Sequence, residues 1–222
     1  MRYFLDTEFD EQAGQIGLIS IGIVREDGKE LYLQACDFWP WEVSPWVREH
    51  VFPGLLHCPH IQHALLQQDD TSLQGNAWAH LKQCVYVQPA SGIVGSHGIQ
   101  LTPRLEKPYP DCFWRSRREM AQEIQAFIDP QRDPHIDLVA WCGSYDHVAL
   151  CQLYGGMMKQ PAGWPHHILD FQWLLQVYGI KDEELPPQET GLHNALHDAR
   201  HLRRLWDLVN SSDWRKEARR GL

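Results

Sequence analysis

The sequence lacks a long apolar run and a secretory leader. No hydrophobic stretch approaches the ~20 residues that a membrane-spanning helix needs. An acidic residue already stands at Asp6, where a signal peptide would carry positive charge followed by an apolar segment. These absences exclude a membrane-spanning protein and predict a soluble chain that is not secreted.

A disulfide framework is also missing. The six cysteines are scattered without framework spacing, which predicts reduced thiols and a cytoplasmic location. One segment is rich in His and Cys, but its spacings match no standard zinc finger. Histidines on the surface of a polar segment are therefore the more ordinary interpretation. A zinc-stabilised interaction module remains the alternative there, with His57, Cys58, His60, His63, His80 and Cys84 as the candidate ligands.

Basic residues are too few for a broad nucleic-acid-binding face. There are 20 Lys and Arg against 29 Asp and Glu, which gives a net charge of −9. Such a balance disfavours an extended electrostatic interface with the phosphate backbone of a polynucleotide. It leaves open an enzyme that holds a few nucleotides through metal ions.

What is present begins with a short apolar strand that leads into two acids. Tyr3 to Leu5 predict a buried strand, and the period-2 alternation of a strand places Asp6 and Glu8 on the same face. Two adjacent carboxylates repel each other unless a cation lies between them, and oxygen ligands suit Mg²⁺ or Mn²⁺. The plainer alternative is a turn at Asp6 with a solvated Glu8.

The rest of the pattern predicts an α/β fold. Further strands are expected over 16–24, 31–35 and 136–141. Helices are expected over 46–51, 114–128, 148–154 and 168–178, and a final helix begins in 191–200 and runs to Val209. The expected buried side of helix 168–178 consists of Leu169, Trp173, Leu174 and Val177.

The chain is predicted to form one domain. Residues 1–210 form its body, interrupted by a loop-rich insertion at about 55–111 with one possible helix over 77–84, and 211–222 form a polar tail.

Two downstream segments bring further acids. Asp146 follows strand 136–141 and a glycine bend, where it could equally cap its helix. His193 and Asp198 are five residues apart, so on one regular helix their side chains would point ~140° apart. His193 must therefore lie in the loop or first turn if both serve one site. His197 competes for the same role, and a zinc face with His193 and His201 is a weaker alternative because no H-E-x-x-H pattern is present.

Together these residues form the motifs D-x-E, D and H-x₄-D. The sequence thereby resembles the DEDDh branch of the 3′–5′ exonucleases, and in particular the mycobacterial polyadenylate-specific exoribonucleases of the RNase AS type. This resemblance implies an RNase H-like mixed sheet flanked by helices. It leaves out the segment at about 55–111, where the sequence departs from the family.

The residue types indicate metal-dependent hydrolysis. Asp6, Glu8, Asp146 and Asp198 would hold two Mg²⁺ ions, which Mn²⁺ can replace, and His193 would accept the proton of the attacking water. The expected product is a 5′-nucleoside monophosphate.

The resemblance implies the substrate and the assembly. It points to the 3′ end of single-stranded RNA, a preference for poly(A) and a homodimer. Phe9, Trp46, Trp114 and Arg115 are candidates to line the end pocket, although Trp46 and Trp114 could equally be core residues. A DNA-directed exonuclease would carry the same five catalytic residues, and a non-catalytic nucleic-acid-binding relative would normally have lost one of the acids.

Overall fold

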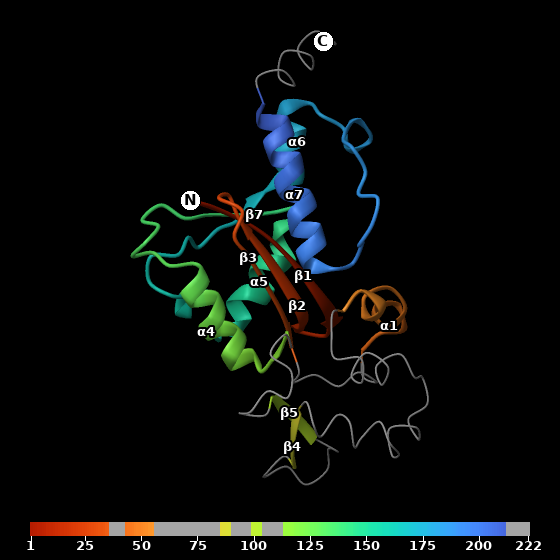
Figure 1. Ribbon diagram of the computed structural model, residues 1–222, viewed down its shortest axis with the longest axis vertical. Coiled ribbons are helices and arrows are strands. Elements are labelled where there is room, and N and C mark those ends of the chain that lie inside the picture. Colours follow the sequence, from red (N-terminus) through yellow and green to blue (C-terminus); the bar gives the residue numbers. More distant parts are fainter. Residues whose placement is uncertain (36–42, 56–84, 90–98, 104–112, 212–222) are drawn as a thin grey trace.

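The computed structural model describes residues 1–35, 43–55, 85–89, 99–103 and 113–211 (Figure 1). A mixed sheet of six strands forms its centre, in the order β6-β3-β2-β1-β7-β8. The strands of this sheet are β1 (Arg2–Gln12), β2 (Gln15–Arg25), β3 (Glu30–Ala35), β6 (Trp114–Arg115), β7 (Asp137–Ala140) and β8 (Leu169–Asp170). The helices are α1 (Pro45–His50), α4 (Arg117–Phe127), α5 (Gly143–Leu153), α6 (Phe171–Tyr178) and α7 (Ala195–Asn210), with 3₁₀ turns η1 (Phe52–Gly54), η3 (Met157–Lys159) and η4 (Asp182–Glu184).

The first three strands form an antiparallel meander, and β2 and β3 cover the strands that the sequence predicts over 16–24 and 31–35. β1 pairs with β2, and β2 pairs with β3, in antiparallel register. On the other side of β1, strands β7 and β8 add in parallel, and β6 joins β3 in parallel. The prediction of an α/β fold with a mixed, helix-flanked sheet is therefore confirmed.

Helices cover both faces of the sheet, because the strands are apolar on both sides. α4 and α5 pack on one face around Tyr3, Leu5 and Ile21. α6 and α7 pack on the opposite face around Phe4, Val24 and neighbouring residues. In Figure 1 the two helix pairs lie on either side of the strands. β1 thus runs through the middle of the molecule with helices on both sides.

Helix α4 begins later than the pattern predicts. Trp114 and Arg115 pair with β3 as β6, and the helix starts after Ser116, whose hydroxyl accepts a hydrogen bond from the Glu119 amide while the Glu119 carboxylate accepts from the Ser116 amide. This capping box fixes the first turn of the helix.

The predicted helix over 168–178 is wrong at its start and in its buried side. Leu169 and Asp170 pair with β7 as β8, and the Asp170 carboxylate caps α6 by accepting from the Trp173 amide. Because the helix starts at Phe171, it buries Phe171 and Leu175, whereas Trp173 is 64% exposed and Val177 is 58% exposed.

Part of the predicted insertion forms its own small sheet. β4 (Val85–Pro89) and β5 (Ile99–Pro103) pair in antiparallel register. The predicted helix at 77–84, the candidate zinc ligands between His57 and Cys84, and residues 212–222 of the tail lie outside the described residues.

None of the described helices has both the length and the apolar character needed to cross a bilayer.

Candidate active site

The first two acids come from the middle of β1. Asp6 pairs with Gly22 and Glu8 with Ser20 on β2, and a register shift follows between Glu8 and Phe9. Both side chains point to the α7 face, as the alternation predicts. Glu8 is only 7% exposed, so its carboxylate lies in a nearly water-free position.

The third acid comes from the first turn of α7. Asn194 caps this helix by accepting a hydrogen bond from the His197 amide, which places Asp198 one turn inside. The helix start can approach the sheet because Gly22 has no side chain: a Cβ there would lie 2.3 Å from the Ala195 carbonyl oxygen and the Leu196 nitrogen. As a result, carboxylate oxygens of Asp6, Glu8 and Asp198 all lie within 4.8 Å of one another.

The fourth acid reaches the site from the opposite face of the sheet. Asp146 lies in the first turn of α5, and its Oδ1 accepts hydrogen bonds from the amide of Thr7 at 2.9 Å and from its hydroxyl at 2.7 Å. Thr7 points to the α5 side because it stands between two residues that point to the α7 side. The negative charge of Asp146 acts on both Asp6 and Glu8.

Burial and mutual repulsion disfavour the charged forms of these acids. The pKa of Glu8 rises to about 8, through burial first and then through the charges of Asp198 and Asp146. Burial also raises the pKa of Asp146 to about 6, against the lowering effect of its hydrogen bonds from Thr7. The pKa of Asp6 lies well above its usual value, with burial as the first cause and the charge of Asp146 as the second.

A hydrogen bond from Gln188 orients Asp198, as those from Thr7 orient Asp146. The Gln188 amide nitrogen donates to Asp198 Oδ1 at 2.6 Å and to the Thr190 carbonyl at 3.2 Å. Burial raises the pKa of Asp198, and the Gln188 hydrogen bond and the nearby His193 oppose that rise. Gln188 therefore holds one oxygen of the carboxylate in place.

His193 lies in the turn before α7. Its φ of 60° is in the left-handed region, which is uncommon for a residue other than glycine. The imidazole lies edge-on to Trp46, with ring centroids 5.1 Å apart, and 6.1 Å from the ring of His50. The Asn194 side chain donates to the Gly54 carbonyl at 2.7 Å and ties this turn to the segment after α1.

His197 takes a different position. Its ring lies against Gly191, where an added Cβ would lie 1.9 Å from His197 Nδ1. Unlike His193, it belongs to α7 itself.

The four candidate substrate-binding residues separate into two pairs. Phe9 follows Glu8 on β1 and stacks on Tyr145, which precedes Asp146, with centroids 5.5 Å apart and planes 8° apart. Trp46 is 52% exposed and borders His193. These two side chains therefore contact neighbours of the proposed catalytic residues or His193 itself.

The other two candidates lie farther off. Trp114 is 4% exposed and occupies the same row of the sheet as Glu8 but three strands away, or ~14 Å at normal strand spacing. Arg115 forms an ion pair with Glu123 on α4. The structure does not bring this pair to the acids.

Sequence reasoning missed three contributors, Thr7, Gln188 and Tyr145. The alternation that places Asp6 and Glu8 on one face of the strand also places Thr7 on the other face. The position of Thr7 could therefore have been predicted from the sequence. Tyr145 directly precedes Asp146, but its stacking on Phe9 depends on the packing of α5 beside β1. Gln188 lies in an irregular loop, where no periodic pattern indicates a direction.

The donor set fits a divalent cation. All ligand atoms of the close group are carboxylate oxygens, which Mg²⁺ and Mn²⁺ prefer. A cation among them would relieve the repulsion that raises their pKa values. The cluster can therefore hold a metal next to an imidazole, which is an arrangement suited to hydrolysis.

The chain is similar in sequence to known proteins and to one family model. Two proteins of Mycobacterium tuberculosis, the 3′–5′ exoribonuclease Rv2179c of strain ATCC 25618 / H37Rv and the 3′–5′ exoribonuclease MT2234.1 of strain CDC 1551 / Oshkosh, are similar to this chain. Each is 33% identical over 213 residues, which covers 96% of the chain and 95% of the relative. The family model described as the 3′–5′ exoribonuclease Rv2179c-like domain matches residues 104–210.

Proposed function

Since this chain belongs to the Rv2179c-like 3′–5′ exoribonucleases, we propose that it hydrolyses single-stranded RNA from the 3′ end in a metal-dependent reaction. The observation that carries the proposal is the meeting of Asp6, Glu8 and Asp198 within 4.8 Å, with Asp146 held beside them by Thr7. These are the four acids of the motifs D-x-E, D and H-x₄-D, which fits an RNase H-like DEDDh fold.

The acids act as ligands for two Mg²⁺ ions. Asp6, Glu8 and Asp198 provide the close group of oxygens, and Asp146 contributes from the α5 side. When bound, such ions supply activation of water and stabilisation of the charge that develops on the phosphate. Thr7 and Gln188 fix the orientation of two of the four carboxylates, and this restricts where the ligand oxygens point.

His193 is the general base of the proposal. It accepts the proton of the attacking water, because histidine is the side chain that most often acts as a general base in such reactions. Its position before the helix N-cap supports this role, since a residue in the helix itself at that spacing would point ~140° away from Asp198. The leaving group is the shortened RNA strand with a free 3′-hydroxyl, and the product is a 5′-nucleoside monophosphate.

The aromatic residues beside the acids provide a surface for the terminal nucleotide. The stacked rings of Phe9 and Tyr145 lie on one side, and the exposed Trp46 lies near His193. Bases bind to such surfaces by stacking, and backbone atoms near Glu8 and Phe9 provide candidate contacts to the 2′-hydroxyl. The resemblance to polyadenylate-specific enzymes adds a preference for adenine and a homodimeric state to the proposal. The scattered cysteines add a cytoplasmic location.

The test is a nuclease assay on substrates with a defined 3′ end. Purified protein is incubated with A, C and U homopolymers of equal length and with single-stranded DNA, in EDTA and then with Mg²⁺ or Mn²⁺. We expect stepwise shortening of RNA from the 3′ end, 5′-AMP as the fastest product, and no reaction in EDTA or with Asp198→Asn. Faster cleavage of DNA than of RNA would instead indicate the deoxyribonuclease alternative, and intact 3′ ends on both substrates would overturn the proposal.

A further inference from the structure

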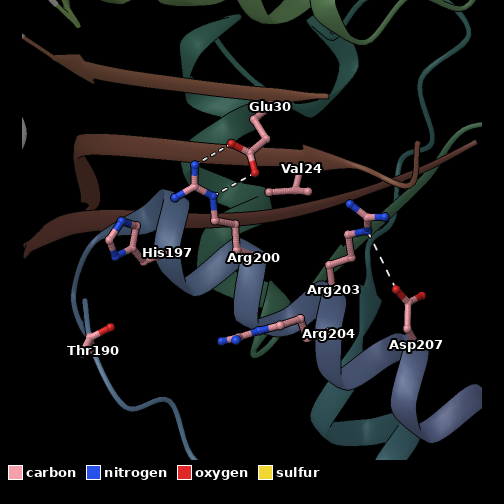
Figure 2. A pocket seen from close by; sticks show the side chains of 8 residues that line it. All are labelled: Val24, Glu30, Thr190, His197, Arg200, Arg203, Arg204 and Asp207. Carbon is pink, nitrogen blue, oxygen red and sulfur yellow. Dashed lines mark hydrogen bonds and ion pairs between the residues drawn. The ribbon is translucent and has the colours of Figure 1, made fainter. Parts of the chain in front are cut away.

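A pocket of about 460 Å³ lies on the outer side of α7, away from the four acids. It is bounded by α7, by the ends of β2 and β3 that lie far from Glu8, and by the loop before α7 (Figure 2). Its lining residues are Val24, Glu30, Thr190, His197, Arg200, Arg203, Arg204 and Asp207.

Three arginines dominate this pocket, although the chain as a whole carries a net charge of −9. Arg200 forms a two-bonded ion pair with Glu30, at 2.8 and 2.6 Å. Arg203 lies 3.9 Å from Asp207, at the limit of an ion pair. Arg204 lies 3.1 Å from the ring nitrogen Nδ1 of His201, and no carboxylate among the described residues forms an ion pair with it.

The side chains that line the pocket carry one more positive than negative charge. Three guanidinium groups face two carboxylates, so one positive charge of the arginines is unmatched. Figure 2 shows the Arg200 head engaged with Glu30, whereas the Arg204 head extends away from both acids. A single positive charge matches a phosphodiester, which carries one negative charge, better than a terminal phosphate, which carries about −1.5 to −2.

The loop before α7 lies between the pocket and the acids and contacts both. Thr190 lines the pocket, and its carbonyl accepts a hydrogen bond from the same Gln188 nitrogen that holds Asp198. His197, the neighbour of Asp198, lines the pocket as well. Arg204 lies six residues after Asp198, which is ~9 Å along the helix axis and ~120° around it. A strand bound at the acids must therefore pass over the loop before α7 to reach the pocket.

We propose that this pocket binds a backbone phosphate of the RNA strand, upstream of the nucleotide that is being removed. Arg204 is the principal contact and Arg203 the second, since guanidinium groups bind phosphate oxygens in pairs. This inference rests on the proposed function. It implies that RNA long enough to reach the pocket binds more tightly than a dinucleotide.

The test compares substrates of increasing length with the variant Arg204→Ala. In the wild type, KM should fall as the oligoadenylate becomes long enough to reach the pocket. In Arg204→Ala we expect this length advantage to shrink about tenfold, and the slope of log KM against log salt to fall by about 0.7, the value for one phosphate contact on a single strand. Arg204→Lys should restore the salt slope because it keeps the charge.

Arg118→Ala is the matched control. Arg118 is an exposed arginine on α4, which packs on the opposite face of the sheet. Its removal changes the net charge by the same amount and should leave the length advantage and salt slope at wild-type values. Thermal unfolding of each variant verifies that it is folded.

The outcomes separate the two proposals. Wild-type activity on RNA combined with an unchanged slope and length advantage in Arg204→Ala would overturn this inference and leave the proposed function standing. If Arg204→Ala instead only relieves inhibition by inorganic phosphate, the pocket binds free anions and the inference is also overturned. Wild-type protein that leaves RNA intact would remove both proposals.

Discussion

Two polar residues restrict the freedom of the acids at the candidate site. Thr7 donates two hydrogen bonds to Asp146, and Gln188 donates one to Asp198. A carboxylate that is held through one oxygen presents the other in a fixed direction, which matters because ligand geometry determines metal affinity. Thr7 and Gln188 are therefore positioning residues of the proposed metal centre.

The two histidines next to Asp198 lead to a first prediction. We expect His193→Ala to lower kcat for RNA hydrolysis by ~10² or more, the usual contribution of a general base. The loss from His197→Ala should be much smaller and should be mainly in KM, since this ring lines the arginine pocket. Steady-state kinetics with oligoadenylate measure both parameters.

The matched control for these variants is His135→Ala. His135 is exposed and directly precedes Ile136 and β7, at the end of the sheet opposite to the acids. Its removal should leave kcat unchanged. Normal turnover by His193→Ala would transfer the base role to His197.

The contact between β2 and α7 determines where Asp198 lies. Gly22 is opposite Asp6 in the β1–β2 register, and the first residues of α7 rest directly on it. No other residue type leaves room for the backbone of Ala195 and Leu196 at this distance. The position of one proposed metal ligand therefore depends on the absence of a side chain on a neighbouring strand.

We expect Gly22→Ala to move α7 outward. The added Cβ would meet backbone atoms at 2.3 Å, and overpacking of this kind costs about 1–3 kcal/mol of the free energy of unfolding. Because Asp198 moves with the helix, activity should fall more than stability alone explains. Urea unfolding and the nuclease assay measure the two effects.

Ser20→Ala serves as the comparison on the same strand face. Its hydroxyl is buried without a hydrogen-bond partner among the described residues, so its removal should change stability little. Gly22→Ala with wild-type stability and activity would show that α7 does not need this close approach.

The elements with a clear period were predictable, and the shortest ones were not. The alternation in β1 and the apolar stripe of α7 are local signals, and both were interpreted correctly. β6 and β8 consist of two residues each and exist only because a neighbouring strand pairs with them. Leu169 therefore looked like part of a helix, and the buried side of α6 was assigned incorrectly.

The residue types of the candidate site were predictable from the sequence, but the residues that hold them in position were not. Four acids in motif order predict a shared metal centre, and three of them do meet. The contacts of Gln188 and the stacking of Tyr145 on Phe9 depend on how loops and helices pack, which no local spacing encodes. For the same reason the pattern did not separate Trp46, which lies beside His193, from Trp114, which lies in the core.

At the scale of the whole molecule, the metal-free protein carries a buried cluster of carboxylates that favours protons. The pKa of Glu8 rises from 4.5 to about 8 and that of Asp146 from 3.8 to about 6. At a pH between the usual and the raised pKa of each group, the folded state binds more protons than the unfolded state. The free energy of unfolding that these groups contribute therefore falls as pH rises. Metal ions can replace the protons at high pH.

This leads to an expectation for thermal unfolding. In EDTA, the Tm contribution of the cluster should decrease from about pH 5 to about pH 8, and Glu8→Gln should show a smaller decrease than the wild type. The gain in Tm on adding Mg²⁺ should increase over the same range, because the ligands lose their protons. Calorimetry at constant ionic strength measures these changes.

The difference between wild type and Glu8→Gln isolates the effect of this group from that of other titrating residues. Identical pH profiles for the two proteins in EDTA would contradict the raised pKa. A Mg²⁺ gain that is independent of pH would separate metal binding from these carboxylates.

The separation of the acids along the chain has a consequence for the protein during its synthesis. Asp6 and Glu8 leave the ribosome first, while Asp198 emerges only after most of the chain has been translated. Until α7 has docked on Gly22, the nascent polypeptide holds an incomplete set of ligands. The proposed metal site is therefore completed only near the end of translation, when the last helix of the chain can pack on the sheet.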